Sequence, residues 1–359
     1  MDFGIFNLAA ARKRRPNAQG SNPCLTKDSW IQTSQGPKQI QDLLSTEFYA
    51  SVNGEFHKAT NFFSTGIKKV YKLVTKEGYE VKVTDNHKIL TTSGWKEAKD
   101  LTLEDKIILN NLSKSENVWL GEGTFEEGWL IGSLIGDGTY GSESLAHLRY
   151  WGEDQKEVAE KALSYMSLSV KHRSDCKVSE NRSNNYSQVS SKGLALLAKK
   201  FGVEKGNKII ISPEIEMASS EFYKGFLRGI FDADGSVQGT IEKGRSIRLS
   251  QTNIEFLKGV QRMLLRLGIK STLYMERMPK RVALLPDGKG GKKEYACKAL
   301  NELVISRSCM TTYRNLINFN GPSKKQRLEN FMTDHKKNFY GSKFEVSFKS
   351  LEYLGYQEV

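Results

Sequence analysis

The sequence contains few cysteines and no long apolar run. Its four cysteines, Cys24, Cys176, Cys297 and Cys309, lie far apart and form no Cys-x-x-Cys pair, which argues against a zinc site and against a disulfide framework. No apolar stretch reaches the length of a membrane span, and the N-terminus lacks the apolar core of a secretory signal. We therefore expect a soluble, cytoplasmic protein without a membrane partner.

Negative charge is the scarcer sign. The chain carries 41 acidic residues against 54 lysines and arginines, which gives a formal net charge of +13 and a pI near 9.3. A surplus of this size favours a polyanionic partner, and nucleic acid is the usual one. With 359 residues, the chain has room for two or three domains.

Two stretches of the chain share one pattern. Residues 130–138 read LIGSLIGDG and residues 227–235 read LRGIFDADG. Each has an apolar first position, a glycine at the third, a small residue at the seventh and Asp-Gly at the end. The apolar positions around both recur at helical spacing, so the sequence predicts a repeated helix.

Small residues define one face of each predicted helix. Gly132 and Gly136 share a face of the first helix, as do Gly229 and Ala233 on the second, because residues four apart are neighbours on a helix surface. Two such faces can approach backbone to backbone. We therefore expect the two helices to pack against each other.

This packing would bring Asp137 and Asp234 together at the C-terminal ends of the two helices. The helix dipole is negative there and the carboxylates repel each other, so both placements are unfavourable without a cation. Oxygen ligands suit a hard divalent ion, Mg²⁺ or Mn²⁺, which activates water and stabilises a phosphodiester leaving group. Asp232 is a weaker candidate because Ile135 occupies its place in the first copy. The alternative is that Asp-Gly merely ends a helix with a turn, and the two copies argue against it.

The paired pattern resembles the LAGLIDADG (dodecapeptide, DOD-type) homing endonucleases. This resemblance implies a pseudo-dimeric αββαββα fold, metal-dependent double-strand cleavage of a long DNA site, and Asp137 and Asp234 as metal ligands. We assign residues 119–334 to the endonuclease, with repeats at about 119–204 and 205–334. The partner would be double-stranded DNA, and the protein is expected to be a monomer.

A polar, alternating stretch follows each repeated helix, at residues 139–151 and 237–252. One face of such strands can lie against DNA, since a β-ribbon fits the major groove. The alternative is a solvated strand face. The predicted base or phosphate contacts are His147, Arg149, Arg245, Ser246, Arg248 and Ser250.

A third helix in each half is predicted to begin near Lys192 and near Arg307. Lys192 resembles the basic residue that family members place near the scissile phosphate, where it could stabilise phosphoryl charge; an exposed, solvated lysine is the alternative. Arg307 is its counterpart and a further predicted DNA contact.

The second half is longer because of residues 278–293, a glycine- and lysine-rich loop expected on the DNA backbone. Its predicted contacts are Lys289, Lys292 and Lys293.

The first part of the chain has a different pattern. Short strands are predicted at 29–33, 39–44, 70–74 and 78–84, with a turn at Gly36-Pro37. Turns at such close intervals indicate a compact all-β module, to which we assign residues 24–118. Strands predicted at 343–348 and 351–359, after a linker, would rejoin it.

Cys24 opens this module, and Thr84-Asp-Asn-His87 follows. Together they resemble an intein of the Hint (hedgehog/intein) fold. The resemblance implies that Cys24 attacks the carbonyl of Pro23 to form a thioester, while Thr84 and His87 polarise and protonate the scissile amide. The chemistry requires a strong thiol nucleophile and an imidazole that titrates near neutral pH. A structural Cys and a structural His are the alternative.

The chain ends carry two further predictions. In residues 1–23, FGIFN, a basic stretch and SNPC resemble the large subunit of ribonucleotide reductase just before an active-site cysteine, which implies a remnant of an interrupted host. A nuclear address is the other interpretation of the basic run. The overall prediction is a multidomain protein, an all-β Hint module (24–118 and 335–359) interrupted by an α/β endonuclease.

An intein normally continues with a strand, a histidine and a terminal Asn, which do not follow Val359 here. We therefore expect thioester formation at Cys24, with ligation only if a C-terminal intein fragment is supplied in trans. A truncated gene is equally compatible with the sequence. The alternative function is a splicing half of a split intein whose endonuclease is inactive and serves as a DNA-binding module.

Overall fold

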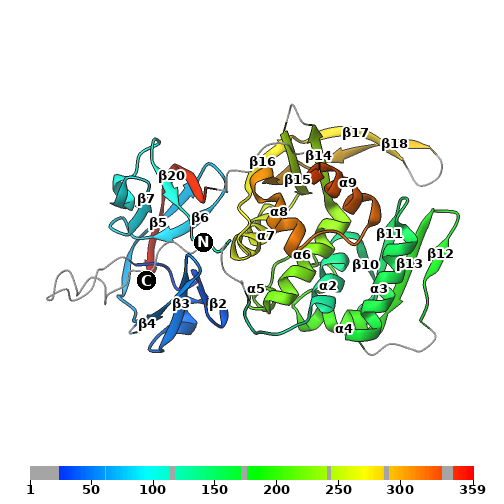
Figure 1. Cartoon of the computed structure of the whole chain (residues 1–359), viewed down its shortest axis with the longest axis horizontal. Coiled ribbons are helices and arrows are strands. Elements are labelled where there is room, and N and C mark those ends of the chain that lie inside the picture. Colours follow the sequence, from blue (N-terminus) through cyan, green and yellow to red (C-terminus); the bar gives the residue numbers. More distant parts are fainter. Residues whose placement is uncertain are drawn as a thin grey trace.

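The computed structural model describes residues 24–60, 62–113, 118–170, 176–240, 244–286, 291–333 and 343–359. Figure 1 shows a β-rich part beside an α/β part, with sheets in both. The predicted host remnant, residues 1–23, lies outside the described residues. Within the described part of the chain, no helix is long and apolar enough to cross a membrane.

The β-rich part contains two sheets. The first has the order β2-β1-β3-β4, built from β1 (Trp30–Thr33), β2 (Gly36–Gln39), β3 (Phe48–Val52) and β4 (Glu55–Ala59). The second has the order β6-β5-β20-β9-β7-β8, built from β5 (Ile67–Thr75), β6 (Glu80–Val83), β7 (Lys88–Thr91), β8 (Gly94–Glu97), β9 (Lys106–Ile108) and β20 (Glu345–Glu358). The 3₁₀ helix η2 (Ala98–Asp100) follows β8.

Two predictions in this part were wrong. The turn lies at residues 34 and 35, one step before Gly36-Pro37, and Gly36 begins β2 with a φ of +90°, a conformation that glycine adopts without strain. The predicted strand at 39–44 is instead the 3₁₀ helix η1 (Ile40–Leu43). Only Leu43 of its four residues is buried, so this segment has no buried alternating face to hold in a sheet.

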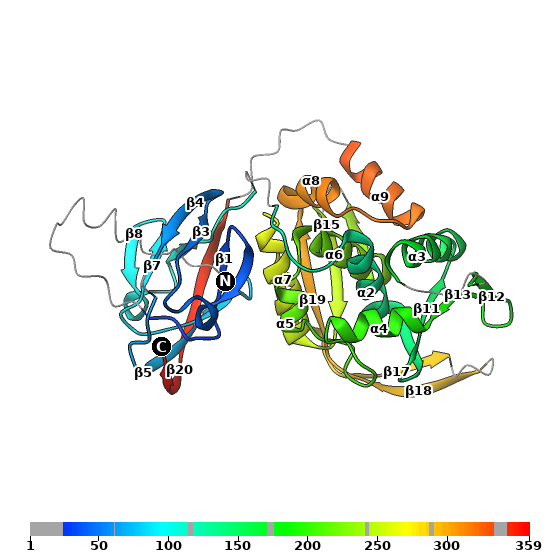
Figure 2. The same ribbon diagram turned by 90° about the horizontal axis from the view of Figure 1, so that it is seen from below.

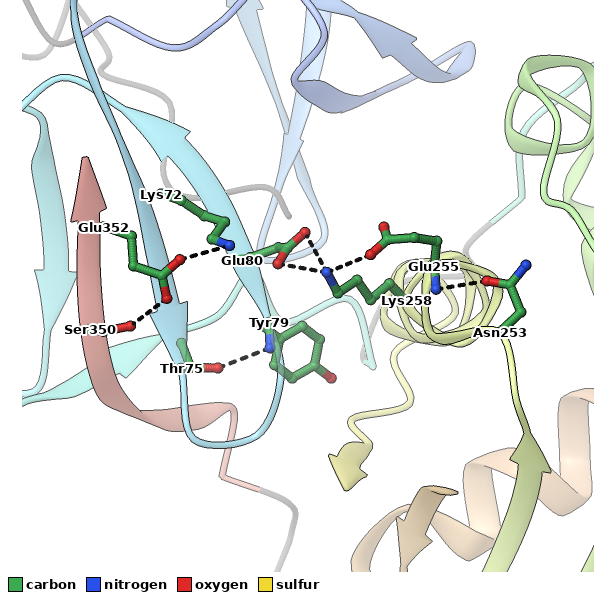
Figure 3. A network of polar contacts seen from close by, with 9 residues as sticks. All are labelled: Lys72, Thr75, Tyr79, Glu80, Asn253, Glu255, Lys258, Ser350 and Glu352. Carbon is green, nitrogen blue, oxygen red and sulfur yellow. Dashed lines mark hydrogen bonds and ion pairs between the residues drawn. The ribbon is translucent and has the colours of Figure 1, made fainter. Parts of the chain in front are cut away.

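The end of the chain returns to the first module. β20 pairs antiparallel with both β5 and β9. It is one long strand with a register shift near Phe348, where the sequence predicted two strands. The ammonium of Lys72 on β5 lies 2.8 Å from the Glu352 carboxylate on β20, and Figure 3 shows this pair. The β-rich part is therefore assembled from two distant segments of the chain.

The α/β part repeats one order of elements. The first half contains α2 (Phe125–Asp137), β10 (Gly138–Ser142), β11 (Leu145–Trp151), α3 (Gln155–Ser169), β12 (Ser179–Asn181), β13 (Tyr186–Ser191) and α4 (Lys192–Lys200). The second contains α6 (Ser220–Asp234), β14 (Gly235–Thr240), β15 (Gly244–Gln251), α7 (Ile254–Arg266), β16 (Thr272–Met278), β19 (Leu300–Ser306) and α8 (Arg307–Leu316). Their sheets have the orders β10-β11-β13-β12 and β14-β15-β19-β16.

Four further elements lie outside this repeat. The short helix α5 (Pro213–Glu216) connects the halves, and α9 (Pro322–Thr333) follows α8. The strands β17 (Arg281–Pro286) and β18 (Lys292–Cys297) form a separate two-stranded ribbon between β16 and β19. The ribbon accounts for the extra length of the second half, at the place where the sequence predicted a loop.

The helices α2 and α6 pack backbone to backbone at the centre of the α/β part, as Figure 2 also shows. A Cβ added at Gly132 would overlap the carbonyl oxygen of Phe226, and one added at Gly225 would overlap that of Phe125. Large side chains, among them Trp129, then fill the space beside the seam. The small face predicted from the sequence is therefore what lets the two helices meet.

Replacing Gly225 with alanine is expected to destabilise the protein by about 2 kcal/mol, since overpacking at a close contact outweighs the better helix propensity of alanine. Urea unfolding of Gly225→Ala measures this effect. Glu160→Ala, at an exposed position of α3, is the matched control and should leave the free energy of unfolding nearly unchanged. Equal stability of Gly225→Ala and the wild type would show that the helices can separate without cost.

The two parts meet where the β5–β6 turn contacts the second half. The Lys258 ammonium on α7 lies 3.0 Å from Glu80 on β6, as Figure 3 shows, and the Gln261 side chain donates to the Glu77 carbonyl at 2.9 Å. The Tyr79 hydroxyl accepts from the Ser271 amide at 3.1 Å. These bonds hold the turn against α7 and the start of β16.

Candidate functional site

Asp137 and Asp234 are the last residues of α2 and α6. A Cβ placed on Gly136 would lie 3.8 Å from an Asp234 carboxylate oxygen, so the two helix ends are adjacent. Burial and the neighbouring charge of Asp234 raise the pKa of Asp137 to about 6. Burial also raises the pKa of Asp234. The structure therefore brings the two carboxylates together in a site that disfavours their charged forms.

Two lysines contact the same helix ends. The Lys208 ammonium donates to the carbonyls of Leu134 and Gly136 at 3.3 Å and to that of Gly138 at 2.5 Å. The Lys324 ammonium donates to the carbonyls of Phe231, Asp232 and Ala233 at 2.5 to 3.3 Å.

These contacts have a simple cause. The last carbonyls of a helix have no partner within it and carry partial negative charge, so an ammonium group is favourable there. Burial lowers the pKa of both Lys208 and Lys324, and the nearby aspartates oppose that shift. The site thus combines two carboxylates with two ammonium groups.

Sequence reasoning missed Lys208 and Lys324. Both lie outside the elements that the two halves share: Lys208 in the connection after α4, and Lys324 at the start of α9. The only sequence feature that could have pointed to them is a lysine that follows a turn after the third helix of each half. Lys192, chosen from the sequence, is the exposed first residue of α4. Its role stays a prediction.

The carboxylate of Asp232 has a structural role. Its carboxylate accepts a hydrogen bond from the Trp129 indole at 2.8 Å and others from the backbone amides of Asn320 at 2.8 Å and Gly321 at 3.3 Å. Burial raises its pKa to about 6, and these donors oppose the shift. Asp232 thus ties α6 to α2 and to the loop before α9.

The acid pair fits a metal ion that takes part of its coordination from substrate. No group of three or more His, Cys, Asp or Glu side chains suited to a metal occurs among the described residues. Mg²⁺ typically uses one or two protein carboxylates and completes its shell with waters and phosphate oxygens. Two mutually repelling carboxylates at negative helix ends, with Asp137 half-buried and Asp234 exposed, are a donor set of this kind.

Substitution Asp137→Asn is expected to stabilise the protein in chelator-containing buffer at pH 8. The folded pKa, about 6, exceeds the usual value of 3.8. The bound proton therefore stabilises the fold below about pH 4, and this contribution is lost as the pH rises through 6. Removing the charge should add on the order of 2 kcal/mol at pH 8 and about half as much at pH 5. Urea unfolding at both pH values measures it, and lower stability of the variant at pH 8 would contradict the electrostatic account.

The predicted contacts on β11 lie on the outer face of the first sheet, where side chains alternate between buried and half-buried. His147 shares a 2.7 Å hydrogen bond with the Ser190 hydroxyl, and burial lowers its pKa. The Arg149 guanidinium donates to Gln188 at 2.7 Å and lies over the Tyr186 ring. Both side chains are held in place by strand β13 on a polar face.

The second sheet corrects one prediction. Arg245 is only 7 % exposed, and its guanidinium donates to the Phe331 carbonyl at 2.7 Å. It anchors β15 to α9 and is not accessible to DNA, because it belongs to the covered end of that strand. Arg248 is half-buried and donates to Glu302 at 3.3 Å and to Ser246, which is itself buried, at 3.0 Å. Ser250, two residues along β15, is half-buried.

The remaining predicted contacts lie in or after the ribbon. Lys292 and Lys293 are exposed at the start of β18. Lys289 lies outside the described residues, as does the side chain of Arg307, whose backbone begins α8.

A second candidate site surrounds Cys24, which is buried. Its amide donates to the Thr84 hydroxyl at 3.3 Å, and its carbonyl accepts from the Thr84 amide at 3.1 Å. Its sulfur lies 3.1 Å from the Thr65 hydroxyl and accepts from the Lys68 ammonium at 3.3 Å. The amide nitrogen that would be cleaved, the thiol and Thr84 are therefore within one hydrogen-bonded cluster.

His87 reaches the same cluster through a turn, in which its amide donates to the Thr84 carbonyl at 3.1 Å. Its Nδ1 is buried and has no hydrogen-bond partner among the described residues. Burial lowers the pKa of His87 to about 4, and a backbone hydrogen bond with Cys24 opposes the shift. The expectation of an imidazole titrating near neutral pH is therefore wrong, because the ring is shielded from water and stays neutral at pH 7.

Comparison with known proteins agrees with two parts of the sequence analysis. Residues 221–318 match the model of a LAGLIDADG-like domain. The chain is 26 % identical over 325 residues to the ribonucleoside-diphosphate reductase NrdEB subunit alpha of Bacillus subtilis, covering 79 % of this chain and 29 % of that protein. It is 27 % identical over 315 residues to the ribonucleoside-diphosphate reductase large subunit of Invertebrate iridescent virus 6, covering 83 % and 30 %. The chain thus spans less than a third of these relatives.

Two similar solved structures each cover part of this chain. A DnaB intein from Synechocystis is 36 % identical, with 24 % of this chain and 69 % of that chain covered and a TM-score of 0.23. The endonuclease I-DmoI in complex with DNA and Mn is 17 % identical, with 54 % and 96 % covered and a TM-score of 0.34. The domain match confirms the resemblance to the LAGLIDADG homing endonucleases, and the reductase relatives confirm the resemblance to an intein in a ribonucleotide reductase large subunit.

Proposed function

We propose, from the premise that this chain contains a LAGLIDADG-like domain, that it is a site-specific DNA endonuclease carried within a protein-processing module of the intein type. The observation that carries the nuclease proposal is the meeting of Asp137 and Asp234 at the ends of two helices packed through glycine. Two neutral side chains at these positions would stabilise the helix ends better than two carboxylates, so the acid pair is explained by function and not by stability.

The repeated order of elements supports the proposed architecture. Two pseudo-symmetric αββαββα halves, at about 119–204 and 205–334, would be inserted in a Hint-type β module formed by residues 24–118 and 335–359. The pairing of β20 with β5 and β9 supports the discontinuous module. DNA would lie across the polar outer faces of the two four-stranded sheets, with the lysines of the β17–β18 ribbon on its backbone.

In this proposal Asp137 and Asp234 hold a divalent ion, Mg²⁺ or Mn²⁺, together with oxygens of the DNA and water. When bound, the ion supplies Lewis-acid stabilisation of phosphoryl charge and favours a water nucleophile. Lys208 and Lys324 place positive charge beside the carboxylates, and we assign to them the electrostatic stabilisation of the phosphoryl group. Lys192 is the weaker candidate because it lies at an exposed helix start.

The Cys24 cluster supports a second chemistry. The thiol would form a bond to the carbonyl carbon of residue 23, the bond from that carbon to the Cys24 nitrogen would break, and the thiol proton would pass to the freed amine. Before the reaction, the Thr84 hydroxyl accepts a hydrogen bond from the Cys24 amide nitrogen. The neutral imidazole of His87 assists the departure of this nitrogen by hydrogen bonding. Thr65 and Lys68 hold the sulfur.

The relatives suggest the DNA target. Because reductase large subunits match most of this chain, we propose that the host is a reductase gene and that the enzyme cuts the uninterrupted copy. Incubation of the full chain with Mg²⁺ and a plasmid carrying that uninterrupted coding sequence should give one double-strand cut at the insertion site. The matched plasmid with the insert in place should stay intact.

A plasmid that is bound but never cut, with either Mg²⁺ or Mn²⁺, would contradict the nuclease. It would support the alternative of an inactive endonuclease that serves as a DNA-binding module. Gel retardation of the same plasmid fragment separates these two outcomes, because it reports binding without chemistry.

A further inference from the structure

Each of the two site lysines lies in the segment that follows the third helix of one half, α4 for Lys208 and α8 for Lys324, and each segment is bonded to the residue before the second helix of the other half. The Asp154 carboxylate, in the first half, accepts hydrogen bonds from the Ser323 amide at 2.9 Å and the Ser323 hydroxyl at 2.5 Å. Ser323 immediately precedes Lys324. The Asn253 side chain, in the second half, donates to the carbonyl of Ile209 at 3.0 Å, and Ile209 immediately follows Lys208.

Asp154 and Asn253 occupy equivalent places in the repeat. Each is the residue just before the second helix of its half, α3 and α7. The same position therefore reaches across the molecule twice, from the first half to the segment of Lys324 and from the second half to the segment of Lys208.

The use of the Asp154 side chain is unusual for its position. A carboxylate before a helix normally accepts hydrogen bonds from amides of the first turn, which stabilises the helix. Asn253 does this for α7, since its carbonyl oxygen accepts from the Glu255 and Phe256 amides at 3.0 and 3.2 Å. Asp154 makes no such side-chain cap. Its carboxylate is committed to Ser323 instead, at the expense of its own helix.

We propose that Asp154 and Asn253 are positioning residues through which each half fixes the lysine that follows the third helix of the other half. This inference rests on the proposed nuclease function and adds to it a division of labour. Asp154 accepts two hydrogen bonds with a charged group, whereas Asn253 donates one with a neutral group. Lys324 is therefore held more firmly than Lys208, and the two DNA strands depend unequally on these anchors.

The test uses the full chain, Mg²⁺ and a duplex spanning the uninterrupted reductase site, with a different label on each strand. Asp154→Ala should slow cleavage of one strand at least about tenfold, because a lysine displaced by a fraction of an ångström loses its alignment. The strand affected should be the one that Lys324→Met slows. Asn253→Ala should slow the other strand, the one that Lys208→Met slows, by a smaller factor. Asp154→Asn, which keeps an acceptor oxygen, should restore most of the rate.

A second measurement does not depend on cleavage. Amide hydrogen exchange at Ser323 should accelerate in Asp154→Ala while the segment around Lys208 keeps its wild-type exchange, and Asn253→Ala should show the reverse. Equal slowing of both strands, slowing of the strand opposite to that of the matching lysine variant, or unchanged exchange at Ser323 would each overturn the proposal. If the wild type cuts neither strand, the nuclease proposal fails by itself, and the exchange result alone decides whether Asp154 anchors the segment of Lys324.

Discussion

Asp137→Asn and Asp234→Asn should each abolish double-strand cleavage of the target DNA, with a loss of at least about 10³-fold in rate, the scale expected when a metal-assisted displacement loses a ligand. Each variant keeps the shape of the side chain and removes one negative charge. Because the two carboxylates lie together at the adjacent ends of α2 and α6, neither can replace the other. The measurement is the rate of conversion of supercoiled plasmid to nicked and linear forms.

The control for this pair is Asp42→Asn, which removes an exposed carboxylate from the β-rich part. It should cut at the wild-type rate. Retention of more than a tenth of wild-type cleavage by either Asp137→Asn or Asp234→Asn would remove these residues from the catalytic centre. The increased stability expected for Asp137→Asn at pH 8 makes loss of folding an inadequate explanation for lost activity.

Hydroxylamine should release residues 1–23 from the wild-type chain, and Cys24→Ala should abolish that release completely. Hydroxylamine cleaves a thioester and leaves an ordinary amide intact, so the reaction reports the acyl shift to sulfur. His87→Ala should slow release by about 10²-fold, the usual contribution of a residue that assists proton transfer. Mass spectrometry of the released peptide and of the shortened chain measures both effects.

Cys297→Ala is the matched control, since it removes a half-buried thiol from the far part of the molecule. Release from Cys24→Ala at the wild-type rate would show that the peptide is lost by another route. Because His87 is neutral at pH 7, its assistance should change little between pH 6 and pH 8. A steep loss of release between those values that depends on His87 would contradict the low pKa deduced from its burial.

Much of the α/β part could be predicted from the sequence because its signals are local and repeated. Apolar residues at helical spacing mark α2, α3, α6 and α7, and Asp-Gly marks the ends of α2 and α6. The meeting of Asp137 and Asp234 followed from the small face alone. A feature that depends on residues three or four apart in one helix can be recognised from the order of the amino acids.

The lysines of the site could not be recognised in this way. Lys208 reaches its helix end from the connection after α4 and Lys324 from the first turn of α9, about 70 and 90 residues after the aspartates they accompany. No spacing rule connects such a residue to a distant helix terminus. Lys192 was chosen because it begins a helix, which is a local signal, and the contacts with the carbonyls beside the acids belong to the other two residues.

Burial explains the two other residues for which the structure differs from the sequence prediction. Arg245 was expected on DNA because it is charged and lies on a polar strand, but α9 covers that end of β15 and the guanidinium bonds to Phe331. The titration of His87 was expected near neutrality because a free imidazole titrates there, whereas the folded chain removes it from water. In both cases the chemistry of the side chain was interpreted correctly, and its surroundings came from segments far away in the sequence.

The most direct test of the central claim is Mn²⁺ binding by the full chain, followed by the loss of the electron paramagnetic resonance signal of the free ion. The wild type should take up Mn²⁺ at the helix ends, Asp137→Asn and Asp234→Asn should each weaken that uptake, and the double variant should lose it. Uptake by the double variant equal to that of the wild type would show that the paired carboxylates do not hold the metal.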